Sequence, residues 1–145
     1  MFDRSRSTLA LSALLVSFAA AGCKSSPEQL PQFQTAGLRV SVLKAYNKKD
    51  RIDIVVKIWN DHDVRVNFDL GDVRLLFNGR EVSPTPGRGV DREPDVQAKS
   101  PREFKWTFEV GDVVGEGQYP VEIRNMTKGD ALVGEPAKFD ILVGR

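Results

Sequence analysis

The chain has 145 residues, of which 41% are hydrophobic and 28% are charged, a composition typical of one globular domain rather than of a disordered protein. Its formal net charge of +1 gives no electrostatic basis for binding nucleic acid. The chain has a single cysteine, Cys23, which excludes an internal disulfide and any zinc site built from several cysteines.

The first 22 residues predict an export signal rather than part of the fold. Arg4 and Arg6 give a short basic start, and residues 9–22 (LALSALLVSFAAAG) are apolar or small. This run is shorter than the about 20 apolar residues that a membrane-spanning helix needs. It matches instead the basic start and short apolar core of a signal peptide, whose end is marked by small residues at a cleavage point.

The stretch AAGC at residues 20–23 resembles the lipobox of bacterial lipoproteins, although Ala20 stands where a leucine is usual. The resemblance implies that the peptide is cut before Cys23 and that acyl chains on its thiol anchor the protein in a membrane. With Lys24 rather than an aspartate after the cysteine, it also implies the outer membrane, facing the periplasm, if the host is Gram-negative. The alternative is an ordinary secretory signal with an unmodified cysteine near its end.

Residues 23–37 are expected to be the lipidated cysteine and a flexible tether, because they hold two prolines and three glutamines without apolar periodicity. From Leu38 to the C-terminus apolar and polar residues alternate, which indicates half-buried β-strands. We therefore expect one domain over residues 38–145 with about seven strands, near residues 38–42, 52–58, 64–70, 73–77, 104–110, 119–123 and 139–143.

Polar turns separate these predicted strands, among them NDHD at residues 60–63 and the hairpin dipeptide Asn78-Gly79. Short antiparallel strands in a domain of this size predict an all-β fold, an immunoglobulin-like antiparallel β-sandwich of two sheets. No disulfide is available to link the sheets, so Phe104 and Trp106 are expected to fill the space between them.

Residues 52–82, IDIVVKIWNDHDVRVNFDLGDVRLLFNGREV, have the order strand, Asn-led turn, strand, and Leu-rich strand ending in Asn-Gly. They resemble the telokin-like, immunoglobulin-related domains that follow bacterial lipoprotein signals. A weaker resemblance is to the immunoglobulin-like intracellular proteinase inhibitors of bacilli. Both resemblances imply the fold, and neither supplies a catalytic residue.

The sequence offers little chemistry. His62, the only histidine in the chain, lies between Asp61 and Asp63 in a predicted turn. General acid–base catalysis needs positioned groups of tuned pKa, and none is indicated, so we expect no enzyme activity and no cofactor. The oxygens of this turn could also serve a calcium ion, but an ordinary polar turn with no metal is expected.

Residues 83–101 form the longest predicted loop, with four prolines. Loops beyond about 12–15 residues in a compact domain are functional or disordered. If the protein contacts a partner, this loop is the first candidate, with Arg88, Asp91, Arg92 and Glu93 as contacts. The alternative is a surface excursion without function, and in either case residues 84–100 are expected to be dispensable for folding.

Together these features predict a lipid-anchored cell-envelope protein that binds or scaffolds a partner without catalysis. Its expected partners are the membrane, through Cys23, and an envelope protein, but not nucleic acid. The alternative function is that of a protease inhibitor that presents the same loop.

Overall fold

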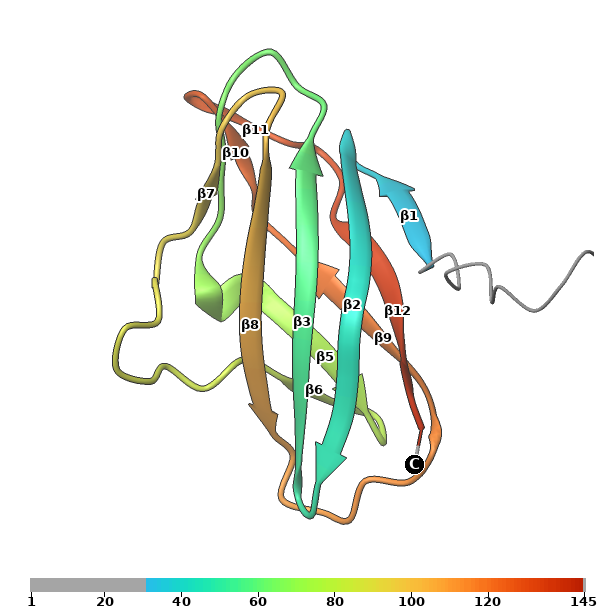
Figure 1. The fold of residues 1–145 in the computed structure, drawn as a ribbon. Helices are drawn as coiled ribbons and strands as arrows, with labels where there is room; N and C mark the ends of the chain where they lie inside the picture. The colour runs from blue at the N-terminus through green and yellow to red at the C-terminus, as the bar shows by residue number, and fades with distance from the viewer. Residues whose placement is uncertain (1–30, 145) are drawn as a thin grey trace, which may run out of the picture.

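The computed structural model describes residues 31–144, and the predicted signal peptide and Cys23 lie outside them. Two four-stranded antiparallel sheets pack face to face, and a third, smaller sheet lies at one end (Figure 1). This confirms the predicted all-β sandwich. Residues 31–144 contain no helix with the length and hydropathy of a membrane span.

The strands of the first sheet follow one another in chain order, whereas those of the other two sheets do not. The first sheet consists, from edge to edge, of β1 (Gln32–Thr35), β2 (Leu38–Lys48), β3 (Arg51–Asn60) and β8 (Pro101–Glu109). The second consists of β12 (Ala137–Val143), β9 (Gly117–Ile123), β5 (Val73–Phe77) and β6 (Arg80–Val82). The small sheet consists of β11 (Ala131–Leu132), β10 (Thr127–Lys128), β4 (Val66–Asn67) and β7 (Asp95–Val96).

The core lies between the two large sheets, because the alternation read from the sequence places every second side chain there. In β3 the inward residues Ile52, Ile54, Val56 and Ile58 are buried. In β8 the rings of Phe104 and Trp106 stack with their centroids 5.3 Å apart, and both are buried. Both aromatics lie between the sheets, as the sequence predicted, but on the edge strand β8 rather than at the centre of the sandwich.

Strand β1 forms within the segment that the sequence predicted as a tether. It pairs with β2 from Thr35↔Leu38 to Gln32↔Ser41. The turn between them places Ala36 and Gly37 at φ of 51° and 73°, a left-handed conformation that glycine adopts without strain. A Cβ at Gly37 would lie 2.2 Å from Nε2 of His62, so position 37 of this turn requires glycine. The sandwich therefore begins at Gln32, before Leu38.

The strand expected at residues 64–70 is mostly absent. Only Val66–Asn67 pair, and a 3₁₀ turn, η1 (Leu70–Asp72), follows. Oδ1 of Asp69 accepts a hydrogen bond from the backbone N–H of Gly71 at 2.8 Å and caps this turn. Aspartate side chains bond nearby backbone groups in this way and so compete with strand pairing.

The predicted loop 83–101 is not one loop, because β7 divides it. Val96 pairs with Val66 of β4 and is 1% exposed, and Pro94 is buried as well. The expectation that residues 84–100 are dispensable for folding is therefore wrong for their C-terminal part. What remains without strand structure is the connection from β6 to β7, residues 83–94, and the short turn 97–100 between β7 and β8.

Candidate functional site: the open side of the sandwich

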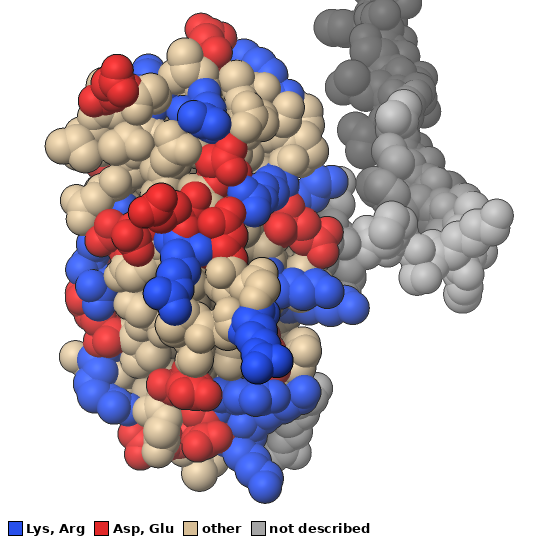
Figure 2. Space-filling model, turned by 90° about the vertical axis from the view of Figure 1, so that its left-hand side faces the viewer, with Lys and Arg blue, Asp and Glu red and all other residues tan. Residues whose placement is uncertain are grey.

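The two lateral sides of the sandwich differ. On one side the sheets are joined, because the N–H of Lys138 donates to Oγ1 of Thr35 at 2.9 Å and Tyr46 forms a parallel bridge with Gly144. On the other side the edge strands are β8 and β6, and residues 83–94 lead from β6 outward past β8 to β7 (Figure 1). We call the free edge of β8 together with residues 83–94 the open side. Figure 2 faces it and shows acidic and basic side chains close together.

The structure does not gather the four predicted contact residues into one site. Arg88 is exposed near the tip of the connection. Glu93 borders a hollow of about 290 Å³ that includes Asp69 and Asp72, and Arg92 borders another of about 310 Å³. Asp91 borders a third hollow, next to β8. The loop therefore presents these side chains in different directions.

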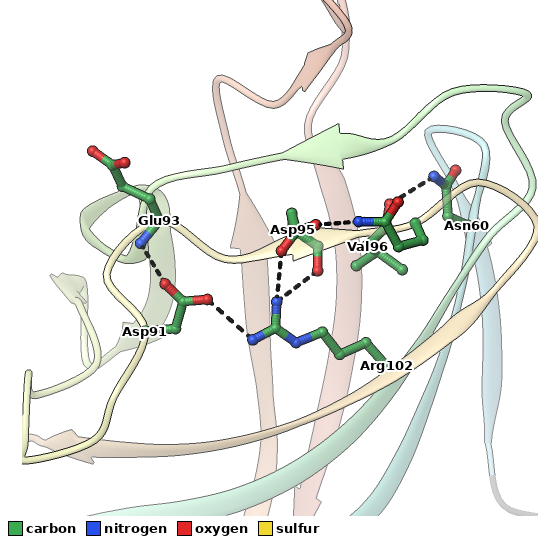
Figure 3. Close-up of polar contacts among 7 residues, drawn as sticks. Asn60, Asp91, Glu93, Asp95, Val96 and Arg102 are labelled. Atoms are coloured by element: carbon green, nitrogen blue, oxygen red, sulfur yellow. Dashed lines mark hydrogen bonds and ion pairs between the residues drawn. The ribbon is translucent and has the colours of Figure 1, made fainter.

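Arg102, which the sequence analysis did not single out, holds the connection against β8 (Figure 3). Its guanidinium donates to Oδ2 of Asp91 at 3.0 Å and to Oδ1 of Asp95 at 2.9 Å. It also donates to the backbone oxygen of Asp95 at 2.8 Å and lies 5.0 Å from the ring centroid of Phe104. Asp91, predicted as a partner contact, is thus an anchor of its own loop.

The third hollow lies between the connection and β8 and has a volume of about 230 Å³. Gly89, Val90 and Asp91 border it on the loop side, and residues 102–106 border it on the strand side. Phe104 and Trp106 are among them, each with a small exposed part. A hollow lined by aromatic and charged residues thus lies beside the edge of a sheet.

The NDHD turn is occupied by structural hydrogen bonds. The amide nitrogen of Asn60, which is fully buried, donates to the backbone oxygens of Val64 at 2.9 Å and Val96 at 3.0 Å (Figure 3 shows the second bond). Nε2 of His62 donates to the backbone oxygen of Ala36 at 2.9 Å. Asp61 pairs with Arg39. These bonds hold the ends of β1, β3 and β7 together, and residues 31–144 hold no metal-binding cluster of histidine, cysteine or acidic residues.

The ion pair between Arg124 and Glu81 shifts the pKa values of both side chains. Arg124, just after β9, donates to Oε2 of Glu81 on the edge strand β6 at 3.0 Å and to Oε2 of Glu122 at 3.0 Å. The hydrogen bond from Arg124 lowers the pKa of Glu81, and the same contacts raise the pKa of Arg124. Both groups are at the surface, so this pair fastens β6 to the sheet without forming a reactive centre.

Comparison with known proteins supports the fold and no specific function. No protein-family model and no curated protein matches the chain, so neither the telokin-like nor the inhibitor resemblance has a counterpart there. The YjhA protein of Bacillus subtilis is similar in structure, with a TM-score of 0.55 and 14% identity over 78% of this chain and 94% of its own. YcdA of Bacillus subtilis, which carries the name "putative lipoprotein", matches with a TM-score of 0.55 and 16% identity. The match covers 79% of this chain but only 39% of YcdA. At these identities the likeness shows a shared β-sandwich fold.

Proposed function

We propose that this protein is a lipid-anchored, non-catalytic binding module of the cell envelope. The observation that carries the proposal is the position of Cys23, directly after a short apolar run and the small residues 20–22. The fold likeness to YcdA, with its lipoprotein name, supports the envelope location. Lys24 favours the outer membrane, facing the periplasm, in a Gram-negative host.

A binding role agrees with the contacts of the buried and half-buried polar side chains, which serve the fold rather than a reactive centre. The ring of His62 is bonded to backbone, and Asn60 is committed to two backbone oxygens. The open side, by contrast, combines an exposed connection, a free strand edge and a hollow bordered by Phe104 and Trp106. Nine residue steps separate Cys23 from Gln32, so even a fully extended chain keeps the start of β1 within about 30 Å of the anchor.

The anchor is tested by Cys23→Ser, with Ser25→Ala as a matched control two residues away. The unmodified protein should incorporate an alkynyl palmitate analogue and enter the detergent phase on Triton X-114 separation, because several acyl chains hold a protein firmly at a membrane. Cys23→Ser should lose both properties and Ser25→Ala should keep them. An unmodified protein that is unlabelled and remains in the aqueous phase contradicts the proposal.

The protease-inhibitor alternative uses the same side of the molecule, because residues 83–94 protrude there and Arg102 fixes their base. Crosslinking the anchored protein in intact envelopes and identifying what is captured separates the two functions. Structural envelope proteins among the captured species support a scaffold. A protease that the purified protein then inhibits supports the alternative.

A further inference from the structure

The outer edge of β8 offers unpaired backbone groups whose direction is fixed by the contacts at both ends of the strand. The backbone oxygen of Ser100 accepts a hydrogen bond from the N–H of Asn60, and the N–H of Val110 donates to the backbone oxygen of Asp50. The backbone N–H and C=O groups of the even-numbered residues of β8 therefore point toward β3. Thr107 accepts a hydrogen bond from the N–H of Thr85 at 2.8 Å on the opposite side. The N–H and C=O groups of a residue in a strand point the same way, so those of Glu103 and Lys105 also point outward.

Among residues 31–144, β8 has a strand neighbour on its β3 side alone, which leaves these four backbone groups open to an added strand. The N–H of Thr85 already donates to the outward oxygen of Thr107, so an added strand must stop short of residue 107. The hollow of about 230 Å³ borders the same stretch, residues 102–106. One water takes up about 30 Å³ of liquid, so the hollow could hold several waters. An aliphatic side chain that displaces them would also fit.

We infer that the open side binds an extended peptide segment of a partner protein, which adds to β8 as an antiparallel strand opposite residues 103–105. In such a strand the residue opposite Phe104 points inward and enters the hollow. The residues opposite Glu103 and Lys105 lie on the outer face, where opposite charges are favoured. Read along the partner, the preferred order is acidic, apolar, basic.

A second copy of this chain is the less suitable occupant. Its own Glu103, Phe104 and Lys105 have the same order of charges, but its Phe104 is 7% exposed and packed in its own core. That ring cannot also fill the hollow. A free apolar side chain on an extended segment can, which favours a peptide over self-association.

The inference rests on the proposed binding function but not on the anchor, and the test is therefore made on full-length mature protein and on its Cys23→Ser form. The probe is the fluorescein-labelled peptide VELKVT, whose first residue lies opposite Trp106 and so stops short of Thr107; binding is followed by fluorescence anisotropy, with empty micelles as a blank for the lipidated protein. Saturable binding of equal strength to both forms is expected. Equal binding together with failed palmitate labelling would refute the anchor alone, whereas labelling without binding would refute the peptide site alone.

Two altered peptides test the charge order and the hollow separately. VKLEVT has the same composition but puts like charges opposite Glu103 and Lys105, and should bind about tenfold more weakly. VESKVT lacks the apolar side chain opposite Phe104 and should also bind about tenfold more weakly or worse. Equal affinity of all three peptides overturns the inference.

Protein variants locate the site. Lys105→Pro removes an outward N–H, which an edge strand tolerates, and should abolish binding, whereas Glu109→Pro removes an outward N–H of the same edge beyond the hollow and should leave binding unchanged. Val90→Asp, in the exposed connection, puts a carboxylate at the hollow and should weaken binding by at least about tenfold if Lys105→Pro fails to fold. Binding that survives both Lys105→Pro and Val90→Asp contradicts the site. A concentration-dependent dimer that excludes the peptide shows that a second copy, not a peptide, is the occupant.

Discussion

Neighbouring residues of β8 have opposite environments, because side chains alternate across a strand. Trp106 is 3% exposed and contacts the rings of Phe104 and Phe68, whereas Lys105 is exposed. Trp106→Ala should lower the free energy of unfolding by about 3–5 kcal/mol, because a large ring leaves a cavity in the core. Urea unfolding followed by circular dichroism measures this loss.

Lys105→Ala is the matched control, one residue away on the other face. It should change the free energy of unfolding by no more than about 0.5 kcal/mol. If both substitutions destabilise the protein equally, the alternation in β8 does not decide which side chains make the core.

Asn60 is a buried polar residue whose amide joins the turn after β3 to β7. Asn60→Ala leaves the backbone oxygens of Val64 and Val96 without this donor, and each buried group left unpaired costs about 1–3 kcal/mol. We expect a loss of roughly 2–4 kcal/mol in chemical unfolding.

Asp63→Ala provides the comparison within the same turn, because the Asp63 side chain is 95% exposed and pairs with Lys99 at 3.6 Å. An exposed pair of this kind contributes about 0–1 kcal/mol. A loss at Asn60→Ala no larger than that at Asp63→Ala would show that the turn, and not the buried amide, fixes this corner.

At the scale of elements, the connection 83–94 and strand β7 have different roles although they are adjacent in sequence. Replacing residues 86–90 by a Gly-Ser linker of equal length keeps Thr85 and the Arg102–Asp91 ion pair. These residues contribute only the half-buried Val90 to the core. The free energy of unfolding should therefore fall by no more than about 1 kcal/mol, seen as a small shift of the melting temperature.

Val96→Ala tests β7 itself. Val96 is 1% exposed and pairs with β4, so its truncation should cost roughly 1–3 kcal/mol. Thermal unfolding of the two variants side by side gives the comparison. A linker variant less stable than Val96→Ala would mean that the connection, rather than β7, supports this side of the sandwich.

At the scale of the whole molecule, the two lateral sides of the sandwich differ in structure, and the proposed function gives each a different role. The side with β1 and β12 is closed by backbone contacts, and β1 is the described strand nearest in sequence to Cys23. The side with β8 and β6 keeps a free strand edge beside a hollow bordered by Phe104 and Trp106. In the proposed function, the first side belongs to the anchored end of the chain and the second receives the partner.

The sequence by itself determined the fold class and the placement of the long strands, because period-two alternation is a local property. It placed Phe104 and Trp106 in the core and indicated the hairpin turn at Asn78-Gly79, whose φ angles of 48° and 75° suit that dipeptide. It also indicated an envelope location through Cys23, which lies outside the described residues.

Only the tertiary structure decided the small sheet, strand β7 and the hollow beside β8. Strands of two residues, such as β4 and β7, are too short for any periodicity and form because a partner strand is nearby. Asp91 and Glu93 are alike in sequence as acidic residues, but Asp91 pairs with Arg102 whereas Glu93 borders the hollow that includes Asp69 and Asp72, which depends on how the chain returns to β8. Alternation along a strand follows from backbone geometry, whereas pairing between distant segments depends on which surfaces remain free once the two large sheets have packed.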